Sequence, residues 1–165
     1  MPSVHPDDFK GALGSWAAGV TVVTTRHNGL VYGITVSSFS SLSMDPTLII
    51  VCLQNSNHLA RLVTDSQTFA VSILADDQQA VSNYFSVSGR DPVPAFDPKI
   101  KTIEWHTGAP IIADSLAHLD CELEEAISGG DHTIAVGRVL GAAYRAEAMP
   151  LLYFRRSYRS IMDPV

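Results

Sequence analysis

The fold is decided by residues 20–37, which read VTVVTTRHNGLVYGITVS. Two runs rich in β-branched residues, Val20 to Thr25 and Leu30 to Ser37, flank the segment Arg26-His27-Asn28-Gly29. Asn-Gly supplies the positive φ angles that a tight hairpin turn requires. The sequence therefore predicts an antiparallel β-hairpin at this position.

Outside this hairpin, strand-like runs outnumber helical ones. The expected strands are Leu48 to Gln54, Phe69 to Leu74, His118 to Ile127 and Thr133 to Ala143, with a last strand or turn at Leu151 to Tyr158. These runs and the hairpin favour a mainly β protein with short helices, whose antiparallel strands close into a barrel rather than a doubly wound parallel sheet.

Three short helices are expected between the strands. The first is capped by Asp7 or Asp8, runs through Ala18 before Gly19, and carries a packing face of Phe9, Leu13, Trp16 and Ala17. The second follows a cap at Ser56 or Asn57, and the third covers Asp76 to Phe85. Residues 88–98, with Gly89, three prolines and Phe96, read as an irregular loop whose aromatic ring could line a pocket.

Composition limits the class of protein. A chain of 165 residues fits one domain, residues 1–165, and its 46% hydrophobic content supplies a substantial core. Its 17% charged content is below the roughly 25% of typical soluble domains, which suggests that a partner subunit covers some apolar surface. A net charge of −6 without a Lys/Arg cluster argues against a nucleic-acid partner.

The cysteines and the amino terminus indicate a compartment. Cys52 and Cys121 lie in apolar, strand-like runs, so we expect buried free thiols in a reducing environment, with a disulfide as the alternative. The first residues lack the features of a secretory signal, and the longest apolar run, Leu48 to Leu53, is too short to span a membrane. We therefore expect a cytoplasmic protein without a membrane segment.

A hydroxyl-rich segment, Ser37 to Ser43, follows the predicted hairpin. It contains five serines around Phe39 and Leu42, a density that a buried strand tolerates only if each hydroxyl finds a partner. Such hydroxyls and the neighbouring amides could bond the polar edge of a flat heterocycle. The alternative is an ordinary polar edge strand.

Two further segments carry polar groups at turns. Asn55-Ser56-Asn57-His58 opens a helix, where free amides favour an anion and Arg61 could add charge, although such residues often only cap a helix. Gly130-Asp131-His132-Thr133-Ile134 places an imidazole beside a carboxylate at the start of a strand. A turn histidine of this kind is often only a surface residue. No G-x-G-x-x-G follows a strand, no G-x-x-x-x-G-K-[ST] occurs, and no metal site is expected.

Three segments in order resemble the flavin reductase family. They are GITVSSFSSLSMDP at 33–46, GDHTIAVGRV at 130–139 and PLLYFRRSYR at 150–159. The similarity covers about Phe9 to Ile161 and is to the short-chain, FMN-binding split-barrel proteins that serve as reductase components of two-component monooxygenases. The resemblance implies an antiparallel split barrel that forms a homodimer.

The resemblance also implies a role for each matched position. The isoalloxazine ring would lie against Thr35, Val36, Ser37, Ser38 and Phe39. The flavin phosphate would lie at Asn55, Ser56 and His58, with Ser41 or Ser43 nearby. Asp131 and the catalytic His132 would lie by the nicotinamide, which Tyr153, Arg155 and Tyr158 could cover.

The function implied by the resemblance is NAD(P)H:flavin oxidoreduction. Hydride would pass from NADH or NADPH to FMN or FAD, and reduced flavin would go to a partner monooxygenase. Two alternatives remain open. One is a flavin- or haem-binding split-barrel protein without activity, and the other is an enzyme like pyridoxamine phosphate oxidase, which should need more basic residues around its substrate phosphate.

Overall fold

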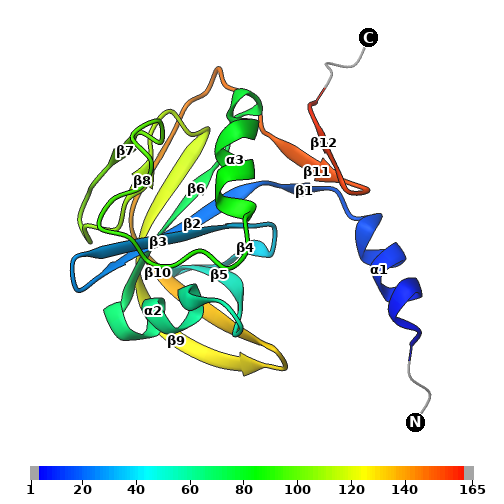
Figure 1. Ribbon diagram of the computed structural model, residues 1–165, viewed down its shortest axis with the longest axis horizontal. Coiled ribbons are helices and arrows are strands. Elements are labelled where there is room, and N and C mark those ends of the chain that lie inside the picture. Colours follow the sequence, from blue (N-terminus) through cyan, green and yellow to red (C-terminus); the bar gives the residue numbers. More distant parts are fainter. Residues whose placement is uncertain (1–3, 162–165) are drawn as a thin grey trace.

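The computed structural model describes residues 4–161, and an antiparallel sheet forms its body (Figure 1). The sheet has seven strands, in the spatial order β3 (Leu30–Val36), β2 (Thr21–His27), β6 (Thr68–Ile73), β9 (Ala117–Gly129), β10 (His132–Tyr144), β5 (Thr47–Gln54) and β4 (Phe39–Met44). Strand makes up 47% of the structure and helix 18%. The prediction of a mainly β protein with short helices is confirmed.

The predicted hairpin joins β2 to β3. His27 pairs directly with Leu30, so that the turn contains only Asn28 and Gly29. Both have positive φ angles, 49° and 78°, and both residue types adopt such angles readily. Here the local sequence is sufficient to specify the turn.

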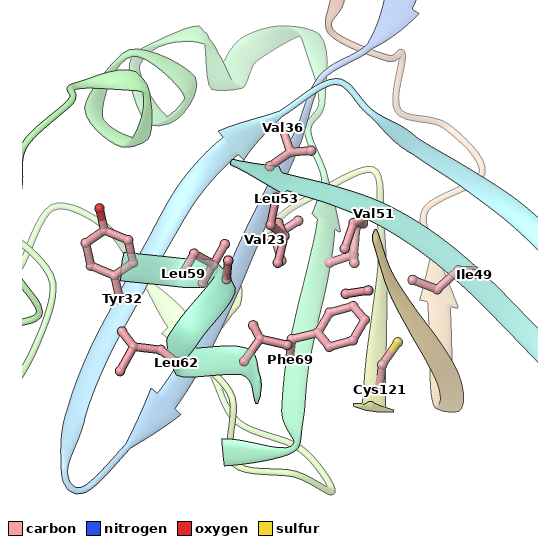
Figure 2. Packing of buried hydrophobic residues seen from close by; sticks show 14 residues of the cluster. Val23, Tyr32, Val36, Ile49, Val51, Leu53, Leu59, Leu62, Phe69 and Cys121 are labelled. Carbon is pink, nitrogen blue, oxygen red and sulfur yellow. The ribbon is translucent and has the colours of Figure 1, made fainter. Parts of the chain in front are cut away.

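The sheet curls around the largest of its core clusters (Figure 2). Phe69 of β6 is fully buried and lies between Val51 of β5 and Cys121 of β9. All seven strands contribute to this cluster, including Phe39 of β4 and Val36 of β3 from the two ends of the sheet. A flat sheet would hold its two end strands far apart, so the shared core requires the curvature of a barrel. The split-barrel prediction is confirmed.

Helix α2 (His58–Ser66) covers one side of this core. The Asn57 side chain caps it by accepting a 2.9 Å hydrogen bond from the Leu59 amide. Leu59, Leu62 and Val63 turn inward and are buried. Of the two predicted caps, Asn57 is therefore the one used.

The third predicted helix is divided into a 3-10 turn, η1 (Asp76–Gln78), and helix α3 (Gln79–Ser86). Phe85 of α3 packs edge-on against Phe96, with the ring centroids 5.0 Å apart, inside a second core cluster. The irregular loop is present as predicted, but Phe96 belongs to this core and lines neither of the two cavities described below for residues 4–161. Two short strands follow, β7 (Thr102–Ile103) and β8 (Ile111–Ile112).

The first helix differs from its prediction. Helix α1 (Pro6–Gly14) begins after His5, whose ring accepts a hydrogen bond from the Asp7 amide at 3.3 Å. It ends before Ala18 because Ala18–Gly19 forms strand β1, which pairs with β11 (Leu152–Phe154) and through it with β12 (Ser157–Arg159). None of its residues is buried in this single chain, so the prediction that one face of the helix packs against the protein is wrong here. Figure 1 shows α1 projecting away from the barrel.

Both cysteines are free thiols, which rules out the disulfide alternative in this structure. Cys121 is buried as predicted, whereas Cys52 is half-buried, which corrects the prediction for that residue. Within residues 4–161, no helix has the length and apolar character needed to cross a membrane.

Candidate active site

Two cavities of ligand size adjoin each other at the end of β3. The first, here called the α3 cavity, has a volume of about 600 Å³ and lies between β3, the 54–58 turn, α3, the 86–90 loop and the β11–β12 hairpin. The second, the α1 cavity, has about 560 Å³ and lies between α1, the 37–40 segment, β5 and the same hairpin. Both volumes fall in the range of roughly 300–1,000 Å³ that small-molecule sites occupy.

Three residues line both cavities: Ser37, Tyr153 and Arg156. Ser37 comes from the segment after β3, and the other two come from the β11–β12 hairpin. The two spaces therefore share a wall to which these three residues contribute.

The hydroxyl-rich segment lies partly along these cavities and partly on an edge strand. Thr35 lines the α3 cavity and its hydroxyl donates to the Ser82 carbonyl at 2.7 Å. Ser38 and Phe39 line the α1 cavity, and the Ser38 hydroxyl donates to the Cys52 carbonyl at 2.9 Å. β4 is at the edge of the sheet. The segment is therefore a cavity wall in one part and a polar edge strand in the other, so each of the two interpretations applies to part of it.

Three predicted residues of this segment lie away from the cavity surfaces. Val36 is buried in the core cluster, which leaves only its backbone to face a ligand. Ser41 and Ser43 line neither cavity, and the Ser43 hydroxyl accepts a hydrogen bond from the Asp45 amide at 3.2 Å.

The predicted phosphate turn borders the α3 cavity. Ser56 and His58 line it, whereas the Asn55 side chain accepts a 2.7 Å hydrogen bond from the Thr133 hydroxyl and does not. The His58 ring packs edge-on against Tyr32 at 5.5 Å and lies 3.5 Å from an Asp91 carboxylate oxygen. Arg61 is exposed and lies outside the cavity, so the charge that it was expected to supply is absent there.

His132 begins β10, directly opposite Gln54 of β5, and Gln54 lines the α3 cavity. Its Nδ1 lies 2.7 Å from an Asp131 carboxylate oxygen, and this hydrogen bond lowers the pKa of Asp131. The Asn55 amide donates to the Asp131 carbonyl at 2.9 Å, which joins this turn to the phosphate turn. His132 and Asp131 thus lie beside the cavity without lining it.

The carboxy-terminal hairpin is held against α3 by Tyr158. Its hydroxyl lies 2.8 Å from the Ser82 hydroxyl and donates to the Asn83 side-chain carbonyl at 3.0 Å. The Tyr153 ring packs on the Tyr158 ring, with centroids 5.4 Å apart. Tyr153 and Tyr158 both line the α3 cavity, and Arg155 lines the α1 cavity.

The structure adds residues that sequence reasoning missed, chiefly on α3 and the loop after it. Arg90 lines the α3 cavity, with its guanidinium 5.0 Å from the centre of the Tyr84 ring and 5.4 Å from that of Phe85. It donates to the Gly33 carbonyl at 2.6 Å and thereby ties the loop to β3. The irregular composition of residues 88–98 was a signal for a pocket wall, but Phe96 was the wrong residue to select.

The family model described as "Flavin reductase like domain" matches residues 13–162. The chain belongs to the flavin reductase family. The resemblance seen in the three sequence segments is thereby confirmed.

Curated relatives that are flavin reductases align with nearly the whole chain. The reductase subunit HsaB of a flavin-dependent monooxygenase from Rhodococcus jostii is 36% identical over 96% of this chain and 80% of its own length. An NADH-dependent flavin reductase from Rhodococcus sp. is 34% identical over 97% of this chain and 89% of its own.

Solved structures of flavin reductases share the fold. Flavin reductase PheA2 has a TM-score of 0.87 and 33% identity, covering 97% of this chain and 100% of its own. The NADH:FAD oxidoreductase SgcE6 of Streptomyces globisporus, in complex with NAD and FAD fragments, has a TM-score of 0.89 and 30% identity, covering 99% and 98%.

Proposed function

We propose that in this chain, which is an NAD(P)H-dependent flavin reductase, the two nucleotides meet at the wall between the α3 and α1 cavities. This position of the two nucleotides is supported by one observation: the two cavities adjoin and share Ser37, Tyr153 and Arg156. Two flat rings must lie at near-contact distance for hydride transfer. Relatives that are NADH-dependent flavin reductases support the reaction itself.

The cavity residues fit a flavin and a nicotinamide. Thr35, Ser37, Ser38 and Phe39 line the cavities, Tyr153 offers an aromatic ring, and among the described residues no Asp or Glu lines either space. When bound, FMN or FAD supplies the hydride acceptor and NADH or NADPH supplies the hydride. The chain itself orients the two rings and shields them from water between β3, the β11–β12 hairpin and α3.

His132 is proposed to act from the rim of the α3 cavity. Its ring is oriented by the hydrogen bond to Asp131 and is placed by the pairing with Gln54. From this position it can hold the nicotinamide nucleotide and interact with the charge that develops on the reacting pair.

A His132→Ala variant tests this role. We expect a higher KM for NAD(P)H or a rate lowered about tenfold or more, with flavin affinity little changed, because the flavin contacts come mainly from residues 35–39. Steady-state rates and flavin titration provide the two readouts, and His27→Ala, on the exposed β2–β3 hairpin, is the matched control. Equal rates in the variant and the parent would remove His132 from the site.

The reaction is tested by mixing the purified chain with each pairing of FMN or FAD with NADH or NADPH and following the loss of NAD(P)H absorbance. Flavin-dependent oxidation with at least one pair is expected. Flavin binding without turnover in all four mixtures would instead indicate a binding protein. The spectrum of the purified protein also shows whether flavin is retained as a cofactor or exchanges as a substrate.

The reduced flavin is proposed to pass to a monooxygenase component. The relative HsaB is itself the reductase subunit of a flavin-dependent monooxygenase, which supports this acceptor class. Cytoplasmic location is proposed on the basis of the two free thiols, since oxidising compartments favour disulfides.

A homodimer is proposed from the surface of α1 and of Trp16, which lies two residues beyond the end of the helix. Phe9, Leu13 and Trp16 are 53%, 58% and 77% exposed, and they form an apolar face with no cover from the described part of the chain. Leu13 and Trp16 also line the α1 cavity. A second copy covering α1 would therefore bury this face and close one side of the cavity.

A further inference from the structure

The turn between β11 and β12 has the same geometry as the β2–β3 turn but a very different sequence. Phe154 pairs with Ser157, so the turn contains only Arg155 and Arg156, with φ angles of 48° and 60°. The β2–β3 turn reaches φ angles of 49° and 78° with Asn28 and Gly29. Asn and Gly adopt this left-handed region readily, whereas a residue with a long side chain is strained there.

The two arginines of this turn are exposed and line the cavities. Arg156 lines both, and Arg155 lines the α1 cavity while its guanidinium lies 5.1 Å from the centre of the Phe154 ring. Within residues 4–161, neither arginine has a carboxylate partner within ion-pair distance. Among the described residues their charge is therefore not neutralised by a carboxylate and is accessible to an anion.

The charge around the cavities contrasts with that of the whole chain. The chain has 17 acidic and 11 basic residues, yet the described residues that line the two cavities include Arg90, Arg155 and Arg156 and no acidic residue. Arg90 is held by the carbonyls of Gly33 and Val87 and by aromatic rings, so its role there is structural. Arg155 and Arg156 are the cations free to bind an anion.

We propose that the strained Arg155-Arg156 turn is a phosphate-binding element that holds a nucleotide at the shared wall of the two cavities. The backbone strain is retained because it directs two guanidiniums to the site, as strain at functional positions commonly does. Guanidinium groups bind phosphate through paired, charge-assisted hydrogen bonds. The phosphate belongs either to the flavin nucleotide or to the nicotinamide nucleotide, and this inference rests on the proposed function.

Transplanting the β2–β3 turn tests the proposal. An Arg155→Asn/Arg156→Gly variant should fold, and its melting temperature should rise by about 2 °C or more because the strain is relieved. Its affinity for the bound nucleotide should fall about tenfold or more because charge-assisted hydrogen bonds are lost. Arg156→Lys keeps the charge and the strain, so its melting temperature should match that of the parent, and its affinity should fall between those of the parent and the double variant because it loses the paired hydrogen bonds of the guanidinium.

Measurements with different ligands distinguish the two possible sources of the phosphate. Weaker binding of FMN and FAD with unchanged binding of riboflavin, which has no phosphate, assigns the turn to the flavin nucleotide. A higher KM for NADH or NADPH with unchanged flavin binding assigns it to the nicotinamide nucleotide. Unchanged affinity for all these ligands, or an equal loss for riboflavin, would overturn the proposal, and a lower melting temperature would overturn the claim of strain.

A control variant and the parent protein separate this inference from the proposed function. Asn28→Arg/Gly29→Arg places the same strain in the other hairpin, and should lower the melting temperature while leaving nucleotide affinity unchanged. If the parent protein shows no flavin reduction at all, the proposed function fails. The direct titrations with FMN, FAD and riboflavin still decide whether the turn binds a phosphate.

Discussion

At the scale of single residues, the two cysteines differ in their surroundings. Cys121 is fully buried beneath the Phe69 ring, and this burial raises the pKa of its thiol to about 12. The reactive thiolate is therefore very scarce near neutral pH. Cys52 is half-buried and lines the α1 cavity, so a reagent in that cavity can reach it.

We expect a thiol reagent to modify one cysteine in the native protein, Cys52, and both after denaturation. Peptide mass spectrometry of the labelled chain gives the site and the extent of modification. A Cys52→Ser variant should remove the native-state labelling and retain the labelling of unfolded protein. Native-state modification of Cys121 at a comparable rate would contradict the burial described for it.

At the scale of secondary-structure elements, β10 passes close to the central ring of the core. A Cβ atom added at Gly137 would overlap the Phe69 ring and lie 3.3 Å from the Cys121 Cβ. The pairing of β10 with β9 shifts register beside Gly137, between it and Val136. The absence of a side chain here allows β6, β9 and β10 to share one tightly packed layer.

Gly137→Ala should therefore destabilise the protein by about 1–3 kcal/mol, the usual cost of overpacking a core. Urea unfolding measures this difference. Gly19→Ala is the matched control, because a Cβ at that strand position meets nothing within 4 Å and should leave stability nearly unchanged. Equal stability of the two variants would show that the core accommodates the extra methyl group.

The elements that the sequence predicted well are those specified by nearby residues. Asn28-Gly29 defines its hairpin, and the apolar pattern from Leu48 to Gln54 defines β5, because both signals are local. The end of α1 was placed too late because the strand that replaces it, Ala18–Gly19, pairs with Leu152 and Tyr153 from the other end of the chain. No local pattern contains that information.

The residues of the candidate site could likewise be predicted only where nearby sequence specified them. Thr35 to Phe39 could be selected because they stand together in one motif, and they line the cavities except for the buried Val36 side chain. Ser82 and Arg90 could not be selected, since they reach the site through a hydroxyl contact with Tyr158 and a hydrogen bond to Gly33. These contacts join segments more than 50 residues apart and exist only once the barrel is folded.

At the scale of the whole molecule, α1 and the residues just after it leave large apolar side chains exposed, Phe9, Leu13 and Trp16 among them, and assembly is proposed to depend on them. We predict that the chain is a dimer and that Trp16→Asp weakens it at least tenfold, because a large exposed aromatic side chain is typical of an interface anchor. Flavin affinity should fall with it, since Trp16 also lines the α1 cavity.

Light scattering across a range of protein concentrations measures the dimer, and flavin titration measures the site. Ile103→Asp, at an exposed position on β7, is the matched control and should change neither. A monomeric parent protein, or a Trp16→Asp variant that dimerises as well as the parent, would contradict the role assigned to α1.

The central claim is that this chain passes hydride from a nicotinamide nucleotide to a flavin. Its most direct measurement is the visible absorbance of FMN or FAD after rapid anaerobic mixing of flavin and chain with NADH or NADPH. The account predicts rapid bleaching of the flavin with at least one pair, at a rate that rises with the amount of protein. Flavin that bleaches no faster with the protein than without it, in all four mixtures, would contradict the account.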